Sequence, residues 1–110
     1  MPEQIAYSDF AKLDIRVGTI KEATPHPNAD KLVILKIDEG KGELRQLVAG
    51  IREAYSEEDL IGKQIPFLAN LEPKKLRGET SNGMILAADM NGKPVLLHPD
   101  TEVPDGSIIK

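Results

Sequence analysis

The clearest indication of the fold is the segment Asp14-Ile15-Arg16-Val17-Gly18-Thr19-Ile20-Lys21-Glu22-Ala23. Ile15 and Val17 alternate with polar residues, as in a strand with one buried face, but the next large apolar residue, Ile20, comes three positions later. A bulge at Gly18 would supply the residue that returns Ile20 to the buried face, and it would bend the strand. The segment therefore predicts a bent strand of the kind that a small barrel needs.

Short apolar segments with turn residues between them make up most of the remaining chain. Further strands are expected at Leu32–Asp38, Leu44–Ala49, Gln64–Leu68, Ile85–Asp89 and Val95–Leu97. The second and third strands should form a hairpin through Gly40-Lys41-Gly42, and Met90–Pro94 should be a turn. No strand alternates with a long helix, so a parallel α/β sheet is disfavoured and a small closed or partly open β-barrel is predicted.

Two short helical turns are expected between the strands. Ser8 is a candidate N-cap for a single turn over Asp9–Leu13, and this turn is too short to be stable without packing against a neighbour. Ser56 is a candidate cap for a second turn, which Gly62 should end.

Composition sets limits on the class of protein. The chain has 110 residues, enough for one domain, and its 40% hydrophobic and 29% charged content is typical of a globular fold. It has no cysteine, no signal segment and no apolar run near the roughly 18 residues of a membrane span. A cytoplasmic protein with no membrane association is expected.

The distribution of charge favours selective binding. The net charge of −4 argues against an indiscriminate nucleic-acid binder. From Lys12 to Arg52, however, there are eight basic residues and six acidic ones, while the C-terminal third is acidic. An acidic protein of this kind can still present one basic face.

No catalytic or metal-binding pattern occurs in the sequence. His26 and His98 each precede a proline in a loop, and both are interpreted as structural residues. We therefore expect no catalytic residue, no metal and no cofactor, and a protein that is not an enzyme.

The segment Asn70–Met84 carries the functional signal. It places Lys74, Lys75 and Arg77 beside Gly78, hydroxyl groups and an amide, ahead of an apolar strand. These cations are either ordinary surface residues on a turn or contacts for an anion such as a phosphate–sugar backbone. Few aromatic residues are available for base stacking, so recognition of shape and phosphate is favoured over sequence readout.

Several motifs in order resemble the tRNA-binding domain family. They are Asp14-Ile15-Arg16-Val17-Gly18, His26–Leu32, Ala49-Gly50-Ile51, and Asn70-Leu71 with Pro73, Lys75-Leu76-Arg77-Gly78, Ser81 and Gly83-Met84. The family includes the C-terminal domain of bacterial methionyl-tRNA synthetase, its separate small β subunit, free-standing tRNA-binding proteins and domains of the endothelial monocyte-activating polypeptide type. The resemblance runs from about Phe10 to the end of the chain.

The resemblance implies an all-β fold, a five-stranded OB-fold barrel with short helical turns and extra C-terminal strands, in a homodimer. It divides the single domain 1–110 into an N-terminal dimerisation segment 1–13, a barrel 14–89 and a C-terminal extension 90–110. The implied function is non-catalytic, structure-specific binding of tRNA. The implied partners are tRNA, a second copy of the chain and the catalytic chain of methionyl-tRNA synthetase.

The matching binding positions are Asn70, Lys75, Arg77, Ser81 and Met84, with Lys31, Arg16 and Lys74 as additions; Met84 also has the character of a packing residue. Glu72 departs from the family pattern, because many relatives carry a cation or a neutral residue there. We expect dimerisation to compensate for this charge. Two alternatives stay open: a peptide-binding secretion chaperone of the same fold, and a module that docks on a synthetase without contacting RNA.

Overall fold

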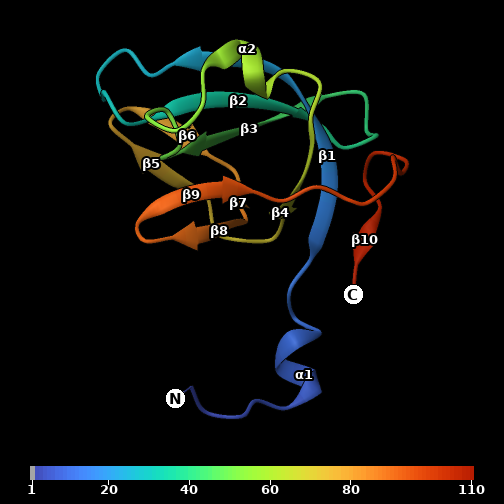
Figure 1. The fold of residues 1–110 in the computed structure, drawn as a ribbon. Coiled ribbons are helices and arrows are strands. Elements are labelled where there is room, and N and C mark those ends of the chain that lie inside the picture. The colour runs from blue at the N-terminus through green and yellow to red at the C-terminus, as the bar shows by residue number, and fades with distance from the viewer. Residues whose placement is uncertain (1) are drawn as a thin grey trace.

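Strands account for most of the regular structure in the computed structural model, which describes residues 2–110 (Figure 1). The strands are β1 (Ile15–Pro25), β2 (Val33–Asp38), β3 (Leu44–Ala49), β4 (Gln64–Leu68), β5 (Lys74–Leu76), β6 (Glu79–Ser81), β7 (Met84–Ile85), β8 (Ala87–Met90), β9 (Lys93–Leu96) and β10 (Ile108–Ile109). The helices are α1 (Tyr7–Phe10) and α2 (Glu57–Leu60). No helix within residues 2–110 is long and apolar enough to cross a membrane.

The main sheet is antiparallel and strongly curled. Its strand order is β3-β2-β1-β4-β7, and β10 pairs with the first residues of β1. The hairpin predicted between β2 and β3 is present, with Val33 opposite Ala49 and Asp38 opposite Leu44. The all-β class is therefore confirmed. The hydrogen-bonded sheet has five strands along its path and the C-terminal β10 as a sixth, and the five-stranded barrel itself stays a prediction.

The concave face of the sheet holds the core. Its fully buried members come from β1, β2, β3, β4 and α2; they are Ile20, Val33, Leu35, Ile37, Leu47, Leu60, Ile65 and Phe67. Burying these side chains is the main source of stability, at about 1.5–3 kcal/mol for each large one. The core thus fixes the strands of this curled half-barrel, which we call the barrel, and the loops project from its two ends.

The bulge in β1 lies further along the strand than predicted. The ladder with β4 is uninterrupted from Ile15 to Thr19, and the register with β2 shifts between Ile20 and Glu22. Gly18 lies inside the curl, where a Cβ atom would collide with the side chain of Ile37 and lie 2.9 Å from the carbonyl oxygen of Asp38. The prediction of a bulge at Gly18 was wrong, because close packing rather than bending requires a glycine there.

Val17 consequently points away from Ile20 and is buried by a different part of the chain. Its backbone N–H donates to the Ser107 carbonyl at 2.9 Å, and its carbonyl accepts from the N–H of Gly106 at 2.7 Å. The side chain lies beside Leu97 and Ile109. The outer face of β1 is therefore covered by the C-terminal segment.

Replacing Gly18 with alanine is expected to lower the free energy of unfolding by about 1–3 kcal/mol, because the added methyl group overpacks the core. Urea titration followed by circular dichroism measures this loss. Gly50→Ala is the matched control, since a Cβ there meets only Leu32 Cδ2 at 3.9 Å. Equal stability of the two variants would contradict the close packing at Gly18.

The two helical turns differ in how well they were predicted. Ser56 caps α2 as expected, its Oγ accepting from the N–H of Asp59 at 3.3 Å, and Gly62 follows with φ +92°. The cap predicted at Ser8 was wrong: α1 begins two residues earlier than expected, with Ala6 as the N-cap residue and no side-chain cap. Figure 1 shows α1 projecting away from the sheet, on the side of β8.

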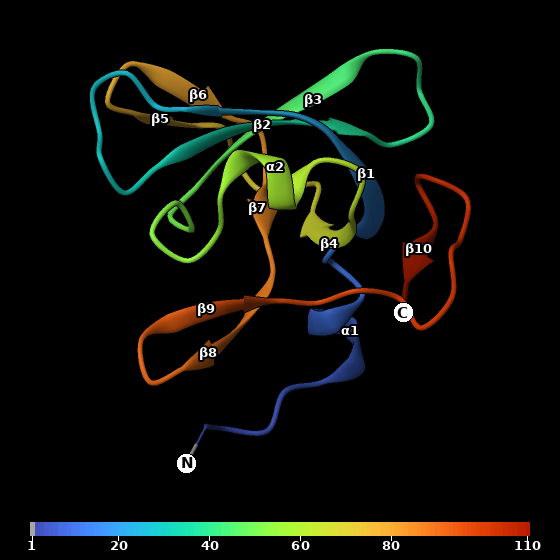
Figure 2. The ribbon, with the colours of Figure 1, turned by 45° about the horizontal axis from the view of Figure 1, so that its top comes forward.

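The predicted strand Ile85–Asp89 is divided in two. Met84–Ile85 pair with β4, and Ala87–Met90 pair with β9 in a separate hairpin whose turn is Asn91-Gly92. Both turn residues have positive φ, 54° and 90°, as a tight two-residue turn requires. The turn expected at 90–94 is confirmed, and the hairpin projects from the barrel (Figure 2).

Isolated hydrogen bonds bridge the two edges of the curled sheet, where no strand ladder joins β3 to β7 within residues 2–110. The N–H of Asn82 donates to the Gln46 carbonyl at 2.9 Å, and the N–H of Val48 donates to Ser81 Oγ at 2.9 Å. We call this contact between β3 and residues 81–83 the seam. It attaches β6 to the barrel.

Arg45 secures one end of the seam. Its guanidinium group donates to both carboxylate oxygens of Glu39, at 2.7 and 3.2 Å, and to the carbonyls of Ala69 and Asn82 at 3.1 and 2.6 Å. It also lies 5.5 Å from the centroid of the Phe67 ring. One side chain thus ties the β2–β3 turn, β4 and the start of β7 together.

Candidate nucleic-acid interface

The basic segment forms a β-hairpin. Lys74 pairs with Ser81, Lys75 with Thr80 and Leu76 with Glu79. The turn consists of Arg77 and Gly78, with φ values of 52° and 94°, as in a type I′ turn. Arg77 therefore sits at the tip of a defined hairpin, with Lys74 and Lys75 on one of its strands.

The three cations of this hairpin are exposed, and within residues 2–110 none of them takes part in an ion pair. Lys31 lies close to Arg77 at the hairpin tip, since Arg77 and residues 29–32 line one shallow cavity of about 360 Å³. Lys31 is 3.9 Å from Glu53, with both side chains more than two-thirds exposed, so this pair is weak and leaves the ammonium group accessible. The structure thus brings together Lys31, Lys74, Lys75 and Arg77.

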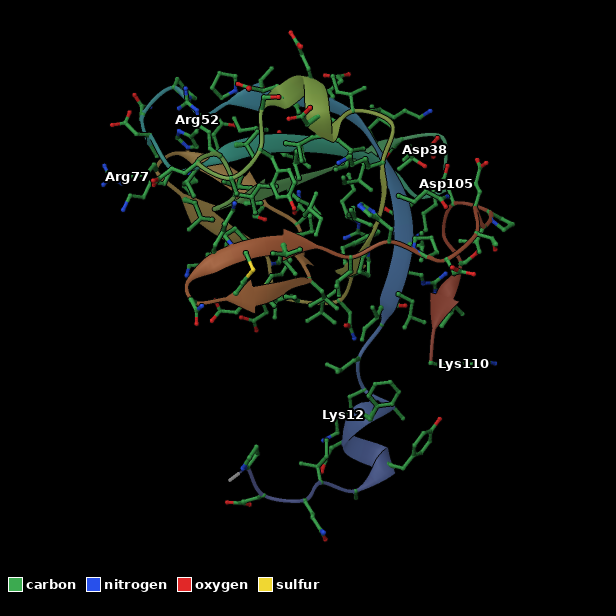
Figure 3. All side chains as sticks on the ribbon, in the orientation of Figure 1. Lys12, Asp38, Arg52, Arg77, Asp105 and Lys110 are labelled. Atoms are coloured by element: carbon green, nitrogen blue, oxygen red, sulfur yellow. The ribbon has the colours of Figure 1, made fainter. Side chains whose placement is uncertain are left out.

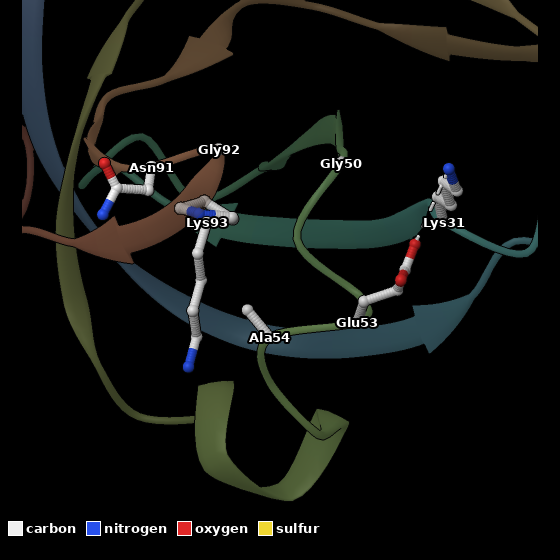
Figure 4. Close-up of a pocket in the computed structure, with 8 residues that line it drawn as sticks. Lys31, Gly50, Glu53, Ala54, Asn91, Gly92 and Lys93 are labelled. Carbon is white, nitrogen blue, oxygen red and sulfur yellow. Dashed lines mark ion pairs between the residues drawn. The ribbon is translucent and has the colours of Figure 1, made fainter.

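Arg52 belongs to the same end of the barrel and was not predicted. Its backbone N–H donates to the Lys31 carbonyl at 3.4 Å, and Figure 3 shows Arg52 and Arg77 on the same side of the molecule. A cavity of about 470 Å³ adjoins Lys31, between residues 50–54 and the tip of the β8–β9 hairpin, where Lys93 is found (Figure 4). The charge of Arg52 was the only signal in the sequence that could have placed it in the candidate site. Its position there depends on a contact with the distant loop that carries Lys31.

Asn70 and Ser81 are occupied by hydrogen bonds within the chain. Asn70 Oδ1 accepts from the N–H of Asp14 at 2.9 Å, and its Nδ2 donates to the Lys12 carbonyl at 2.7 Å. Ser81 is 4% exposed, and its hydroxyl donates to the Gly83 carbonyl at 2.9 Å while accepting at the seam. Asn70 holds the N-terminal segment, and Ser81 holds the hairpin.

Arg16 lies away from the basic hairpin, where β1 pairs with β10. Its Nε donates to Asp14 at 2.6 Å, and Nη1 donates to the Gly106 carbonyl at 3.1 Å. The hydrogen bond that Arg16 donates to the Asp14 carboxylate raises the pKa of Arg16 above its ordinary value. The structure does not bring Arg16 or Asn70 together with Arg77.

Met84 belongs to an apolar row on the outer face of the sheet. Ile109, Ile15, Leu68 and Met84 are aligned across β10, β1, β4 and β7, and Met84 is 47% exposed. Exposed large apolar side chains also occur in the terminal segments and after β4, namely Ile5, Tyr7, Leu13, Leu71, Leu97 and Ile108, and elsewhere at Leu44, Ile61 and Met90. We use the name apolar face for the row together with the residues of the terminal segments and of the segment after β4.

The two histidines differ in environment. His26 is 3% exposed and hydrogen-bonded through both ring nitrogens, which agrees with its structural interpretation. His98 is exposed, and its Nδ1 donates to the Gln64 carbonyl at 2.7 Å. Within residues 2–110, no group of three or more His, Asp or Glu side chains is arranged to hold a metal ion.

Comparison with known proteins places this chain in a family. Residues 15–108 match the family model described as "Putative tRNA binding domain". The chain is 54% identical over 108 residues to a methionine–tRNA ligase of Pyrococcus horikoshii, and 50% identical over 109 residues to that of Parabacteroides distasonis. Each alignment covers 98% of this chain but only 15% and 16% of the ligase, respectively.

Two solved structures have the same fold over nearly the whole chain. One is a MetRS-related protein of Pyrococcus horikoshii, with a TM-score of 0.92, 35% identity, and coverage of 99% of this chain and 100% of that one. The other is the chaperone CsaA of Bacillus anthracis, with a TM-score of 0.88, 36% identity, and coverage of 98% and 100%.

The match over residues 15–108 defines a binding module and not a catalytic domain. This chain belongs to the tRNA-binding domain family, and it is related to a segment of methionine–tRNA ligases.

Proposed function

We propose that this protein binds tRNA by shape and backbone charge, with the β5–β6 hairpin as its main contact. The observation that supports this most directly is the group of exposed cations, Lys74, Lys75 and Arg77, held on a defined hairpin beside Lys31. Ammonium and guanidinium groups bind phosphate oxygens without reading sequence. Arg52 extends this basic surface along the end of the barrel.

Asn70 and Ser81 serve this proposed interface indirectly. Both use their side-chain groups on neighbouring backbone, so we propose that they position the N-terminal segment and the hairpin. Met84 belongs to the apolar face, and Arg16 lies opposite Ile108 where β1 pairs with β10. In a dimer they would flank the tRNA or the partner chain rather than complete the hairpin site.

A second copy of the chain is the proposed partner of the apolar face. Patches of exposed Ile, Leu, Met and Tyr are rare on monomers and are common at subunit interfaces. The proposed interface joins the dimerisation segment 1–13 to the extension 90–110, and the barrel 14–89 carries one basic hairpin per subunit. Two hairpins on one rigid body would offset the charge of Glu72 through avidity.

Relatives named as methionine–tRNA ligases support a role beside a synthetase catalytic chain in the cytoplasm. There this module would increase the affinity of the synthetase for tRNA. One observation favours a second candidate. The CsaA structure has the same fold, and the apolar face offers side chains that an extended peptide could contact. This alternative predicts binding of unfolded polypeptide without binding of tRNA.

The test replaces Lys75 and Arg77 with alanine and titrates bulk tRNA in a gel-shift assay. Loss of two charge-assisted contacts is expected to weaken binding by about ten- to hundredfold. The slope of log affinity against log salt should fall by about 2, since two phosphate contacts are removed.

The matched control is Lys21→Ala/Lys41→Ala, which removes two exposed cations away from the hairpin tip; Lys41 lies in the β2–β3 turn, at the opposite end of the barrel (Figure 1). Equal tRNA affinity of the hairpin variant and the control would refute the hairpin as the contact site. Absence of tRNA binding by the wild-type protein would favour the peptide or docking alternatives.

A further inference from the structure

One strand of the basic hairpin has little to hold it in place. β6 is fixed to β3 by the seam and by Gln46, whose Nε2 donates to the Thr80 carbonyl at 2.9 Å. Apart from its ladder with β6, β5 makes a single hydrogen bond to the rest of residues 2–110, and this bond joins the Leu76 carbonyl to His26 Nε2 at 2.9 Å. Leu76 directly precedes Arg77, so this bond lies at the base of the hairpin tip.

The hydrogen bonds of His26 define its protonation. The N–H of Asn28 donates to Nδ1 at 2.9 Å, so Nδ1 carries no proton. A carbonyl oxygen only accepts, so Nε2 carries the proton and donates it to Leu76. The ring is therefore the neutral Nε2–H tautomer, with both nitrogens satisfied in a site that is 3% exposed.

The same residue closes the loop between β1 and β2. The backbone N–H of His26 donates to the Leu32 carbonyl at 3.1 Å, and the N–H of Leu32 donates to the Ala29 carbonyl at 3.3 Å. This loop carries Lys31, which lines the cavity shared with Arg77. His26 thus links the two segments that supply the basic surface.

We propose that His26 is a positioning residue for the basic hairpin: its Nε2–H bond to Leu76 holds the Lys75–Arg77 tip against the Lys31 loop. This inference rests on the proposed function, because it assigns His26 a role in the tRNA affinity of that hairpin. In the free protein, the hairpin tip should lose order when this bond is lost.

Two substitutions of His26 test its two side-chain hydrogen bonds separately. In His26→Gln the amide Nε2 lies the same number of bonds from the backbone as the histidine Nε2, so it can still donate to Leu76. In His26→Asn the Oδ1 replaces Nδ1 and still accepts from Asn28, but no donor reaches Leu76. A role in positioning the hairpin therefore predicts rescue by glutamine, and a role confined to the loop predicts rescue by asparagine.

We expect His26→Asn to bind tRNA about tenfold more weakly than wild type, and His26→Gln to stay within about threefold. Added to Lys75→Ala/Arg77→Ala, His26→Asn should cause little further loss, because the bond acts through the side chains already removed. Asparagine binding as well as or better than glutamine would overturn the proposal, as would full additivity with the hairpin variant.

Amide hydrogen exchange decides the same question without tRNA. Residues 74–81 of His26→Asn should exchange about tenfold faster than in wild type, while β2 and β3 keep their protection. Unchanged exchange in the hairpin would overturn the proposal.

If both variants fail to fold, ¹⁵N spectra of the wild-type histidine ring serve instead, and a protonated Nδ1 would overturn the proposal. Wild-type protein that shows the ordered hairpin but does not bind tRNA would refute the proposed function and leave the positioning bond intact.

Discussion

Replacing Arg45 with alanine is expected to lower the free energy of unfolding by about 3–5 kcal/mol, because it leaves a buried carboxylate without its partner. Glu39 is 8% exposed and would lose both of the hydrogen bonds that it receives from Arg45. The carbonyls of Ala69 and Asn82 would lose their donor at the same time. Arg45 secures one end of the seam, so its loss should weaken the contact between β3 and residues 81–83.

Urea unfolding followed by circular dichroism measures the effect of Arg45→Ala. Lys41→Ala is the matched control, because Lys41 also faces Glu39, at 3.9 Å, but its side chain is 66% exposed and its pair is screened by water. The control should cost about 0–1 kcal/mol. A loss below about 1 kcal/mol for Arg45→Ala would contradict a structural role for the pair.

Introducing Tyr7→Asp together with Ile108→Asp is expected to separate the proposed dimer and to weaken tRNA binding by about 10² to 10⁴. Tyr7 is 77% exposed and Ile108 is 60% exposed, so neither substitution disturbs the core of one subunit. Two charged groups within an apolar interface would remain unpaired and desolvated. Each subunit would then offer tRNA a single hairpin.

Sedimentation velocity measures the state of association, and the gel-shift titration measures the affinity. Ile61→Asp is the matched control, because Ile61 is 52% exposed and directly follows α2, on the side of the barrel away from α1 (Figure 1). Dimers that persist in the doubly substituted protein would refute the apolar face as the interface. A monomer with wild-type affinity would refute avidity.

The features predicted correctly from the sequence are those that local chemistry determines. Ser56 and Gly62 mark the ends of α2 because a cap and a left-handed residue act within one turn. The β2–β3 hairpin follows from alternating apolar residues and a glycine-rich turn. The bulge in β1 was misplaced because Gly18 is required by the Ile37 side chain of a neighbouring strand, which periodicity along β1 does not reveal.

The candidate site was predicted in part for the same reason. The cations of the hairpin are adjacent in sequence, so their proximity needs no knowledge of the fold. Asn70 and Ser81 were predicted as binding residues, yet their side chains contact backbone that lies 56 and 33 positions away. Neither Arg45 nor Arg52 was singled out, because their partners are brought to them only by the curl of the sheet.

The pairing of β1 with the end of the chain bears on how the protein reaches this structure. β1 contacts β2, β4 and β10, and Arg16 bonds to the Gly106 carbonyl 90 positions along the sequence. Closing so long a loop costs chain entropy before any contact repays it, and folding slows as contacts become more distant in sequence. The pairing of β1 with residues 106–109 therefore cannot form until this long loop has closed. We expect folding on a timescale of milliseconds to seconds, slow for a domain of this size.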